Sequence, residues 1–421
     1  MTTRLVAVAL VVGLAARLAF SLVYWHDKPL THDEQEYLAY GINIARGAGF
    51  TRTLPGAFEG ENTLAFSRAP LYPAFLAAVF RVTGVPAAMP IAVPSVVQIS
   101  QAVVGCVGVW LASLIATRMS GPATGAMAAW LTALWPSQVW LSAYALSEVL
   151  YAPLVFGAAY AAGAALDWHD RPASESPRLS PVIAGLVMGL AALTRSAALA
   201  FALVTAWLFW RRLSWRAAAA FVLATTCVVA PWTWRNALVH GRLIPVAADG
   251  GVNLWIGNHP YATGEGDMAT NVPLKRAHRA VVSSHPGAGP EVLDEVFGRE
   301  ALRWIVESPM RVARLVAMKA FYAVVPIGPS YRAHSTMYAV ASAVPYAVAL
   351  PFAIAAVARW RRLTRPPVML IALAGSAWLL MLVFFPHERY RLPAIDPVVI
   401  VLVAAWLTRP SWAPRPAWSA S

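Results

Sequence analysis

Long apolar runs recur along the whole chain, and they restrict its fold more than any other feature. Each is close to the roughly 20 residues that a helix needs to cross a bilayer. The first is at 5–25, and others lie at about 92–117, 122–141, 149–166, 215–231, 336–358, 366–385 and 393–408. A longer run at 182–210 has room for two short spans, with LTRS at 193–196 as the turn between them. The sequence therefore predicts an all-α, polytopic transmembrane helical bundle with about ten spans.

The composition agrees with a protein whose main partner is a lipid bilayer. Of the 421 residues, 59% are hydrophobic and 13% are charged, which is too little charge to cover a soluble protein of this length. The 18 tryptophans fit as well, because Trp gathers at membrane interfaces. The formal net charge of +13 does not indicate nucleic-acid binding, since the basic residues form neither one patch nor one basic helix.

The first apolar run is interpreted as an uncleaved span. It is longer than the apolar part of a typical signal peptide, and no clean A-x-A cleavage site follows it. Arg17 interrupts the run. We expect its side chain to snorkel to the nearer interface, with a role inside the bundle as the alternative.

Clusters of basic residues between the runs predict the orientation. With the N-terminus inside and ten spans, Arg118, the segments 210–216 (WRRLSWR) and 359–365 (RWRRLTR), and Arg409 lie on the cytoplasmic side, as the positive-inside rule requires. The same count puts the segments about 26–90, 142–148, 232–335 and 387–391 outside. We therefore expect a single domain at 1–408, followed by a disordered cytoplasmic tail at 409–421.

The two long outer loops contain helical patterns. In the first loop, 69–84 is apolar but short for a span, so it is predicted to lie along the interface. In the second loop, 291–324 is amphipathic with helical periodicity, which predicts a helix that runs down to the membrane surface.

The densest acidic cluster of the chain lies directly after the first run. Thr31 and Glu34 have the spacing of a capping box, which predicts a helix start, and Asp33 and Glu34 would lie in its first turn. Glu34 and Glu36 are therefore interpreted as the start of a surface helix. Asp33 and Tyr37 are four residues apart and would share one face of this helix.

A carboxylate at this position, just outside the bilayer, can act as a general base toward a hydroxyl or an amine. Asp33 is the candidate for this role, and one alternative is that it only helps to start a surface helix. Another alternative is a divalent metal ion held by Asp33 with His26, His32 and nearby acids, although these residues lack a fixed ligand spacing.

Two further charged residues occur at predicted outer turns. Glu148, in YALSEVLYAP at 144–153, is either a cap of the following span or a second acid of a site. Arg195, in LTRS, lies in a tight hairpin between two short spans, where an arginine is costly unless it is paired or faces water. A guanidinium suits a phosphate, so Arg195 is predicted to contact an anionic ligand or a lipid headgroup.

The last outer segment, HERYRLP at 387–393, holds three more candidates. Glu388 and Arg391 have the spacing of an internal ion pair, and Arg389 or Arg391 could instead meet a phosphate. Signatures of nucleotide and hydrolase chemistry are absent from the sequence, which has no G-x-x-x-x-G-K-[ST], H-E-x-x-H or G-x-S-x-G and no G-x-G-x-x-G after a strand.

Six motifs follow one another along nearly the whole chain. They are HDEQEYLAYGINIARGAGF (32–50), SRAPLYPAFLAAVFRVTG (67–84), LSE (146–148), LTRS (193–196), WRNALVHGRLIPVAADGGVNLWIGNHP (234–260) and ERYRLP (388–393). Their order and spacing resemble the GT-C membrane glycosyltransferases that use polyprenyl-phosphate sugars, especially bacterial relatives of protein O-mannosyltransferase and of the lipid A aminoarabinose transferase. The resemblance implies a helical bundle whose first outer loop forms juxtamembrane helices.

The resemblance also implies roles for individual residues. Asp33 matches the catalytic base, and Glu148 matches a second acid that is Asp in many relatives. Arg195 and Arg391 match positions associated with the carrier phosphate, and Arg389 is assigned with them. The residues expected to support the site are Glu34, Tyr37, Arg68 and Glu388. Some members of the family bind a divalent metal ion, which is therefore a candidate cofactor.

The predicted function is transfer of a hexosyl or pentosyl group from a polyprenyl-phosphate donor, with inversion, to a lipid, glycan or protein acceptor. The active site would face the extracytoplasmic side of a bacterial inner membrane, and the arginines would stabilise the leaving phosphate. One alternative is a transporter or flippase of lipid-linked substrates, which predicts inverted repeats and polar residues near the membrane midplane. The other is a non-catalytic subunit of an envelope-assembly complex.

Overall fold

The computed structural model describes residues 1–54, 68–168, 180–266, 268, 270–326, 336–359 and 367–408. Within these ranges every regular element is a helix, which confirms the all-α fold class of a polytopic membrane protein. The tail at 409–421, for which disorder is predicted, lies outside the described residues.

All the apolar runs form helices. The first gives α1 (Thr2–Ala19), which continues into the short π-helix η1 (Phe20–Tyr24). The others give α4 (Ser95–Ser120), α5 (Pro122–Leu134), α6 (Pro136–Trp140), α7 (Glu148–Trp168), α8 (Ser180–Thr194), α9 (Ala198–Arg212), α10 (Trp215–His240), α16 (Thr336–Ala358), α17 (Val368–Val383), α18 (Glu388–Ala394) and α19 (Asp396–Leu407). The predicted division of 182–210 into two helices at LTRS is confirmed.

Helix length supports fewer spans than the ten predicted. Among the described residues, five helical segments are long and apolar enough to cross a membrane, namely α1 with η1, α4, α7, α10 and α16. The pair α18 and α19 is a sixth if its 46° bend lies within one span. The remaining helices α5, α8, α9 and α17 have 13 to 16 residues. The sequence itself breaks these runs, because Pro136 follows α5 closely and LTRS separates α8 from α9.

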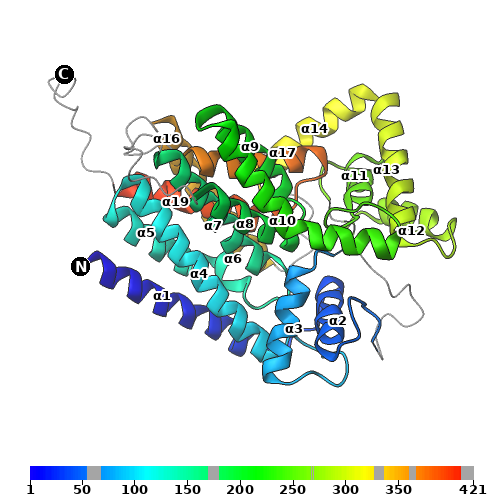
Figure 1. Cartoon of the computed structure of the whole chain (residues 1–421), viewed down its shortest axis with the longest axis horizontal. Helices are drawn as coiled ribbons and strands as arrows, with labels where there is room; N and C mark the ends of the chain where they lie inside the picture. The colour runs from blue at the N-terminus through cyan, green and yellow to red at the C-terminus, as the bar shows by residue number, and fades with distance from the viewer. Residues whose placement is uncertain are drawn as a thin grey trace.

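The helices of the two long loops gather at the end of the molecule opposite the start of α1 (Figure 1). They are α2 (His32–Arg46), α3 (Leu71–Thr83), α11 (Gly250–Asn258), α12 (Val272–Ser283), α13 (Pro290–Glu307) and α14 (Pro309–Val324). The segment 291–324, predicted as one helix, is two helices, because Pro309 cannot continue α13 and begins α14 instead.

Helix α2 begins and ends where its sequence dictates. The capping box is confirmed: the Glu34 backbone N–H donates to Thr31 Oγ1, and the Glu34 carboxylate accepts from the Thr31 N–H at 2.8 Å. Gly47 ends the helix with φ of 81°, a left-handed conformation that glycine adopts without strain. Buried side chains between α2 and α3, among them Leu38 and Phe80, fix α2 against the rest of the first loop.

Arg17 acts inside the bundle, so the snorkelling prediction is wrong. Its side chain is 1% exposed and donates to the carbonyl oxygens of Gly13 at 2.9 Å, Ala133 at 3.2 Å and Thr132 at 3.4 Å. Because α5 ends at Leu134, the last carbonyl groups of that helix lack donors within the helix. The Arg17 guanidinium supplies these donors.

A buried lysine connects the second long loop to the bundle. Lys319 of α14 donates from Nζ to Asn258 Oδ1 at 3.1 Å and to the carbonyl oxygens of Leu382 and Val383, each at 3.2 Å. These contacts join the end of α11 to the end of α17. The segment that follows α17 leads to His387 and α18, so this clamp helps to place the residues of the site described below.

Replacing Lys319 by Met should lower the free energy of unfolding by about 1–3 kcal/mol, the usual cost of leaving buried acceptors without a donor. Thermal unfolding of the purified protein in detergent measures the change. Lys275→Met is the matched control, because Lys275 is exposed on α12. Equal stability of the two variants would show that the clamp contributes nothing.

Candidate active site

A cavity of about 650 Å³ opens between the two long loops and the helical bundle. Side chains from α2, the α8–α9 turn, α9, α11, α17 and α18 line it. Five residues that the sequence analysis singled out lie on its wall, namely Asp33, Tyr37, Arg68, Arg195 and Arg389. Residues up to 356 positions apart in the sequence thus share one cavity.

Asp33 lies in the first turn of α2 and contacts two arginines. Arg68, just before α3, donates from Nη2 to Asp33 Oδ1 at 2.6 Å, and Arg389 of α18 donates to Oδ2. Burial alone would raise the pKa of Asp33, but the two guanidiniums outweigh it and hold the pKa well below its usual range. Asp33 is therefore ionised, and it lines the cavity while paired with Arg68 and Arg389.

Glu148 is the second acid of the same network. It begins α7 and its side chain is fully buried. Arg389 Nε donates to Glu148 Oε1 at 2.5 Å, and Arg195 Nη1 lies 2.8 Å from the same oxygen. Arg389 consequently bridges Asp33 and Glu148. Ser147 completes the connection, because its hydroxyl lies 3.0 Å from Tyr37 Oη and accepts from Arg195 at 3.4 Å.

The arginine of the LTRS turn points into this cavity. Its guanidinium pairs with Glu148 and lies over the Tyr390 ring, 5.5 Å from the centroid. The Thr194–Ser196 turn and the start of α9 line the cavity around it. Arg195 is thus held inside the protein, at a wall of a cavity large enough for an anionic group.

Glu34 and Glu36 are buried, so the prediction of a surface helix is wrong for both. Besides its capping role, Glu34 accepts from the Ala145 N–H at 3.0 Å, which ties α2 to the segment before α7. Glu36 accepts from Arg52 at 2.6 Å and from Arg68 Nε at 2.7 Å. The covering arginines lie 16 and 32 residues away in the sequence, so no local pattern could reveal the burial of Glu36.

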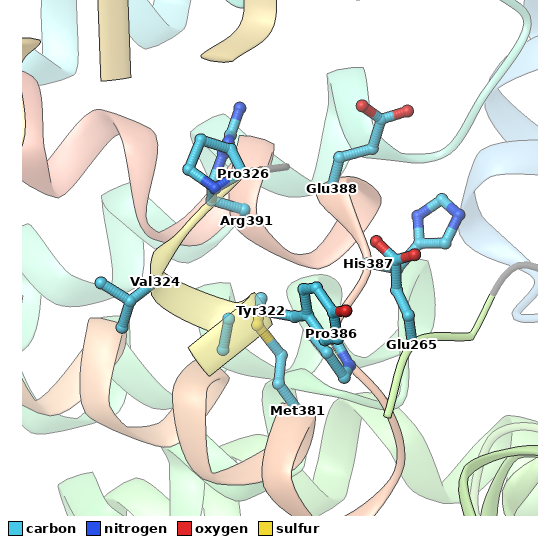
Figure 2. Close-up of a pocket in the computed structure, with 10 residues that line it drawn as sticks. Glu265, Tyr322, Val324, Pro326, Met381, Pro386, His387, Glu388 and Arg391 are labelled. Atoms are coloured by element: carbon cyan, nitrogen blue, oxygen red, sulfur yellow. The ribbon is translucent and has the colours of Figure 1, made fainter. Parts of the chain in front are cut away.

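Only part of the last outer segment reaches the cavity. Arg391 is buried beside Asp396, with Nε 3.0 Å from Oδ1, and donates to Ser342 Oγ at 2.7 Å. Glu388 accepts from Tyr338 Oη at 2.8 Å. Both line a separate pocket of about 10 Å³ together with residues of α14 (Figure 2).

The helical turn of α18 explains this division. Residues 388 and 391 are three apart and share one face, so Arg389 falls on another face, toward the cavity. The phosphate role predicted for Arg391 stays a prediction, but the geometry favours Arg389 and Arg195 for such contacts.

Three potential metal ligands lie together at the mouth of this network. One ligand atom from each of His32, Asp33 and Glu36 lies within 4.8 Å of the others, whereas His26 pairs with Asp27 instead. One imidazole and two carboxylates suit a divalent transition-metal ion. However, Arg68 already donates to both carboxylates, so the set fits an ion only if this guanidinium withdraws.

Several lining residues were not identified from the sequence, among them Asp249, Asn253, His387 and Tyr390. Asp249 stands directly before Gly250 and Gly251, a pattern typical of an ordinary helix cap, so nothing local distinguished it. The only available indication was its position inside one of the six motifs.

No protein-family model and no curated protein matches the sequence. Solved structures do match. The oligosaccharyltransferase of Archaeoglobus fulgidus, tethered with an acceptor peptide, superimposes with a TM-score of 0.60 and 14% identity over 96% of this chain and 49% of that one. The chain shares its fold with an archaeal oligosaccharyltransferase.

Two further matches complete the comparison. The same archaeal enzyme, AglB, in complex with an inhibitory peptide and a dolichol-phosphate gives a TM-score of 0.54 at 13% identity, covering 96% of this chain and 50% of that one. The chain thus spans about half the length of AglB. ArnT from Cupriavidus metallidurans, bound to undecaprenyl phosphate, gives 0.41 at 16% identity over 96% of this chain and 77% of that one, a similarity too low to support a conclusion.

Proposed function

We propose that this protein is an integral-membrane glycosyltransferase that moves a sugar from a polyprenyl-phosphate donor to an acceptor at the extracytoplasmic face of a bacterial inner membrane. The observation that carries the proposal is the single cavity shared by a carboxylate, Asp33, and the two arginines Arg195 and Arg389. A base and an anion-binding pair in one cavity are the parts that transfer from a phosphate-linked donor requires.

The cavity suits a ligand with a charged head and an apolar tail. Its polar wall lies near α2 and α18, while Leu199, Ala200 and Leu203 of α9 line another side. Leu203 is 74% exposed, so the apolar surface of α9 continues from the cavity to the outside of the bundle. A polyprenyl chain would follow this surface with its phosphate at the arginines, and a solved structure of AglB is a complex with a dolichol-phosphate.

The charges of the network favour an incoming phosphate. The guanidiniums of Arg52, Arg68, Arg195 and Arg389 pair with the carboxylates of Asp33, Glu36 and Glu148. A phosphate matches the planar fork of an arginine and would compete with the carboxylates for Arg195 and Arg389.

This competition also prepares the base. While Arg389 and Arg68 hold Asp33, its proton affinity is low. When the phosphate draws Arg389 away, the proton affinity of Asp33 rises toward its ordinary value. Asp33 then takes the proton of the acceptor hydroxyl or amine as that group attacks the anomeric carbon. The bond from this carbon to the phosphate oxygen breaks on the opposite face, which inverts the anomeric centre and leaves the carrier phosphate on the arginines.

The test is release of free polyprenyl phosphate by the purified full-length protein, incubated with undecaprenyl-phosphate-linked sugars and a membrane extract as the source of acceptor. Sugar-dependent release supports a transferase. A flippase would move these lipids across vesicles without releasing the phosphate, and a non-catalytic subunit would do neither.

Replacing Arg195 by Ala is expected to weaken binding of undecaprenyl phosphate by about tenfold or more, since a hydrogen bond to a charged group is worth about 1.5–3 kcal/mol. Titration of the purified variant with this lipid measures the effect. Arg242→Ala is the control, because Arg242 pairs with Glu295 on an exposed surface away from the cavity. Unchanged binding would remove Arg195 from the donor site.

A divalent ion at His32, Asp33 and Glu36 is an alternative use of the same carboxylates. If it operates, EDTA abolishes release and added Mn²⁺ restores it, because the ion must be present to displace Arg68. If Asp33 acts as described above, EDTA leaves release unchanged.

A further inference from the structure

A second carboxylate lines the cavity besides Asp33, and its surroundings differ from those of Asp33. Asp249 occupies the N-cap position of α11, where an aspartate ordinarily accepts from a backbone N–H of the first turn. Here its side chain makes no such bond. Asp294 of α13 takes over the cap instead, accepting from the Val252 N–H at 2.9 Å.

Close packing of α11 on α13 explains why Asp294, and not Asp249, caps α11. A Cβ placed on Gly251 would lie 1.9 Å from the Asp294 carbonyl oxygen, so only glycine permits this approach. The close contact brings Asp294 to the helix start and leaves Asp249 free of a structural role there.

Asp249 has no partner within the part of the chain that the structure describes. It makes neither a hydrogen bond nor an ion pair with another such residue, although it lines a cavity rich in arginines. Burial raises the pKa of Asp249 above its ordinary value, and Asp294 adds to the rise, while Arg68 and Arg195 only partly oppose it. Only its own backbone N–H donates to the Asp249 carboxylate, so a ligand with hydroxyl groups would supply hydrogen bonds that the described residues do not.

Asn253 stands one helical turn after Asp249 and lines the same cavity. Its backbone N–H bonds to the Asp249 carbonyl oxygen at 3.1 Å, which sets the spacing of the two side chains. The carboxylate accepts hydrogen bonds, and the amide both accepts and donates. Together they match neighbouring hydroxyl groups, whereas the negative charge of Asp249 disfavours a phosphate at this wall.

We propose that Asp249 and Asn253 form the subsite that binds the hydroxyl groups of the sugar carried by the donor. The inference rests on the proposed function and deepens it. Because the sugar is bonded directly to the phosphate, a phosphate held at Arg195 and Arg389 places the sugar in this same cavity. The two sides of the cavity then recognise different parts of one molecule, the arginines its phosphate and the α11 wall its hydroxyls.

The test compares binding of bare and glycosylated carriers to the purified full-length protein. The probes are undecaprenyl phosphate and undecaprenyl phosphate bearing glucose, mannose, galactose or arabinose. Asp249→Asn and Asn253→Ser are expected to weaken binding of the glycosylated carrier that the native protein prefers, by about tenfold or more for Asp249→Asn. Binding of bare undecaprenyl phosphate should be unchanged in both. Glu295→Gln is the control, since Glu295 is exposed on α13 and pairs with Arg242 outside the cavity.

The possible outcomes distinguish failure of the proposed subsite from failure of the proposed glycosyltransferase function. If the native protein binds no carrier at all, the proposed function fails and the subsite fails with it. If it binds the carriers but prefers no glycosylated one over the bare one, the subsite alone is overturned. The same holds if both variants bind every probe as the native protein does, or if they lose affinity for bare and glycosylated carriers equally, as a general disturbance of the loop would cause.

Discussion

Replacing Asp33 by Asn is expected to lower the rate of sugar transfer by about 10²–10⁴-fold, the contribution of a positioned general base. The amide has nearly the same shape as the carboxylate but cannot accept the proton of the acceptor. Release of labelled undecaprenyl phosphate from a glycosylated carrier, measured at saturating donor, gives the rate.

The same variant separates a catalytic from a structural role. Asp33 competes with the donor phosphate for Arg389, so Asp33→Asn should bind undecaprenyl phosphate at least as tightly as the native protein does. A structural role would instead weaken binding and transfer together. Transfer at the native rate by folded Asp33→Asn would rule out Asp33 as the base, and Glu295→Gln again serves as the exposed control.

Local patterns predicted the parts of the site that depend on neighbouring residues in the sequence. The capping box at Thr31 and Glu34 gives the start of α2, and that start fixes where Asp33 points. The LTRS turn likewise places Arg195 between two short helices. In both places the relevant interactions span four residues or fewer, so periodicity and capping rules were sufficient.

The sequence could not predict what depends on distant partners. Local spacing predicts Glu36 on a surface. It is buried because Arg52 and Arg68 approach it from other parts of the first loop, which no local pattern indicates. The sequence predicts phosphate contacts for both Arg389 and Arg391, but the register of α18 against the bundle decides which arginine reaches the cavity. Asp249 stands at a helix start, and only the packing of α13, which supplies Asp294 as the cap, distinguishes it from an ordinary N-cap.

Arg389 makes the site a single electrostatic unit. It is the only described residue that donates to both Asp33 and Glu148, which come from different helices. Glu148 in turn contacts Arg195, so the base, the second acid and the turn arginine are linked through direct ion pairs. Because Glu148 is fully buried, these two guanidiniums are the main groups that stabilise its charge.

Replacing Glu148 by Gln should therefore destabilise the protein by about 3 kcal/mol, toward the lower end of the cost of removing one partner from a buried ion pair, because the arginines also face the cavity. Denaturant titration in detergent measures the loss. The double variant Glu148→Gln with Arg195→Ala should be more stable than the sum of the two single losses predicts, since it removes the cation together with its anion. Simple addition of the two losses would show that Glu148 and Arg195 are not coupled and that Arg389 alone balances the charge of Glu148.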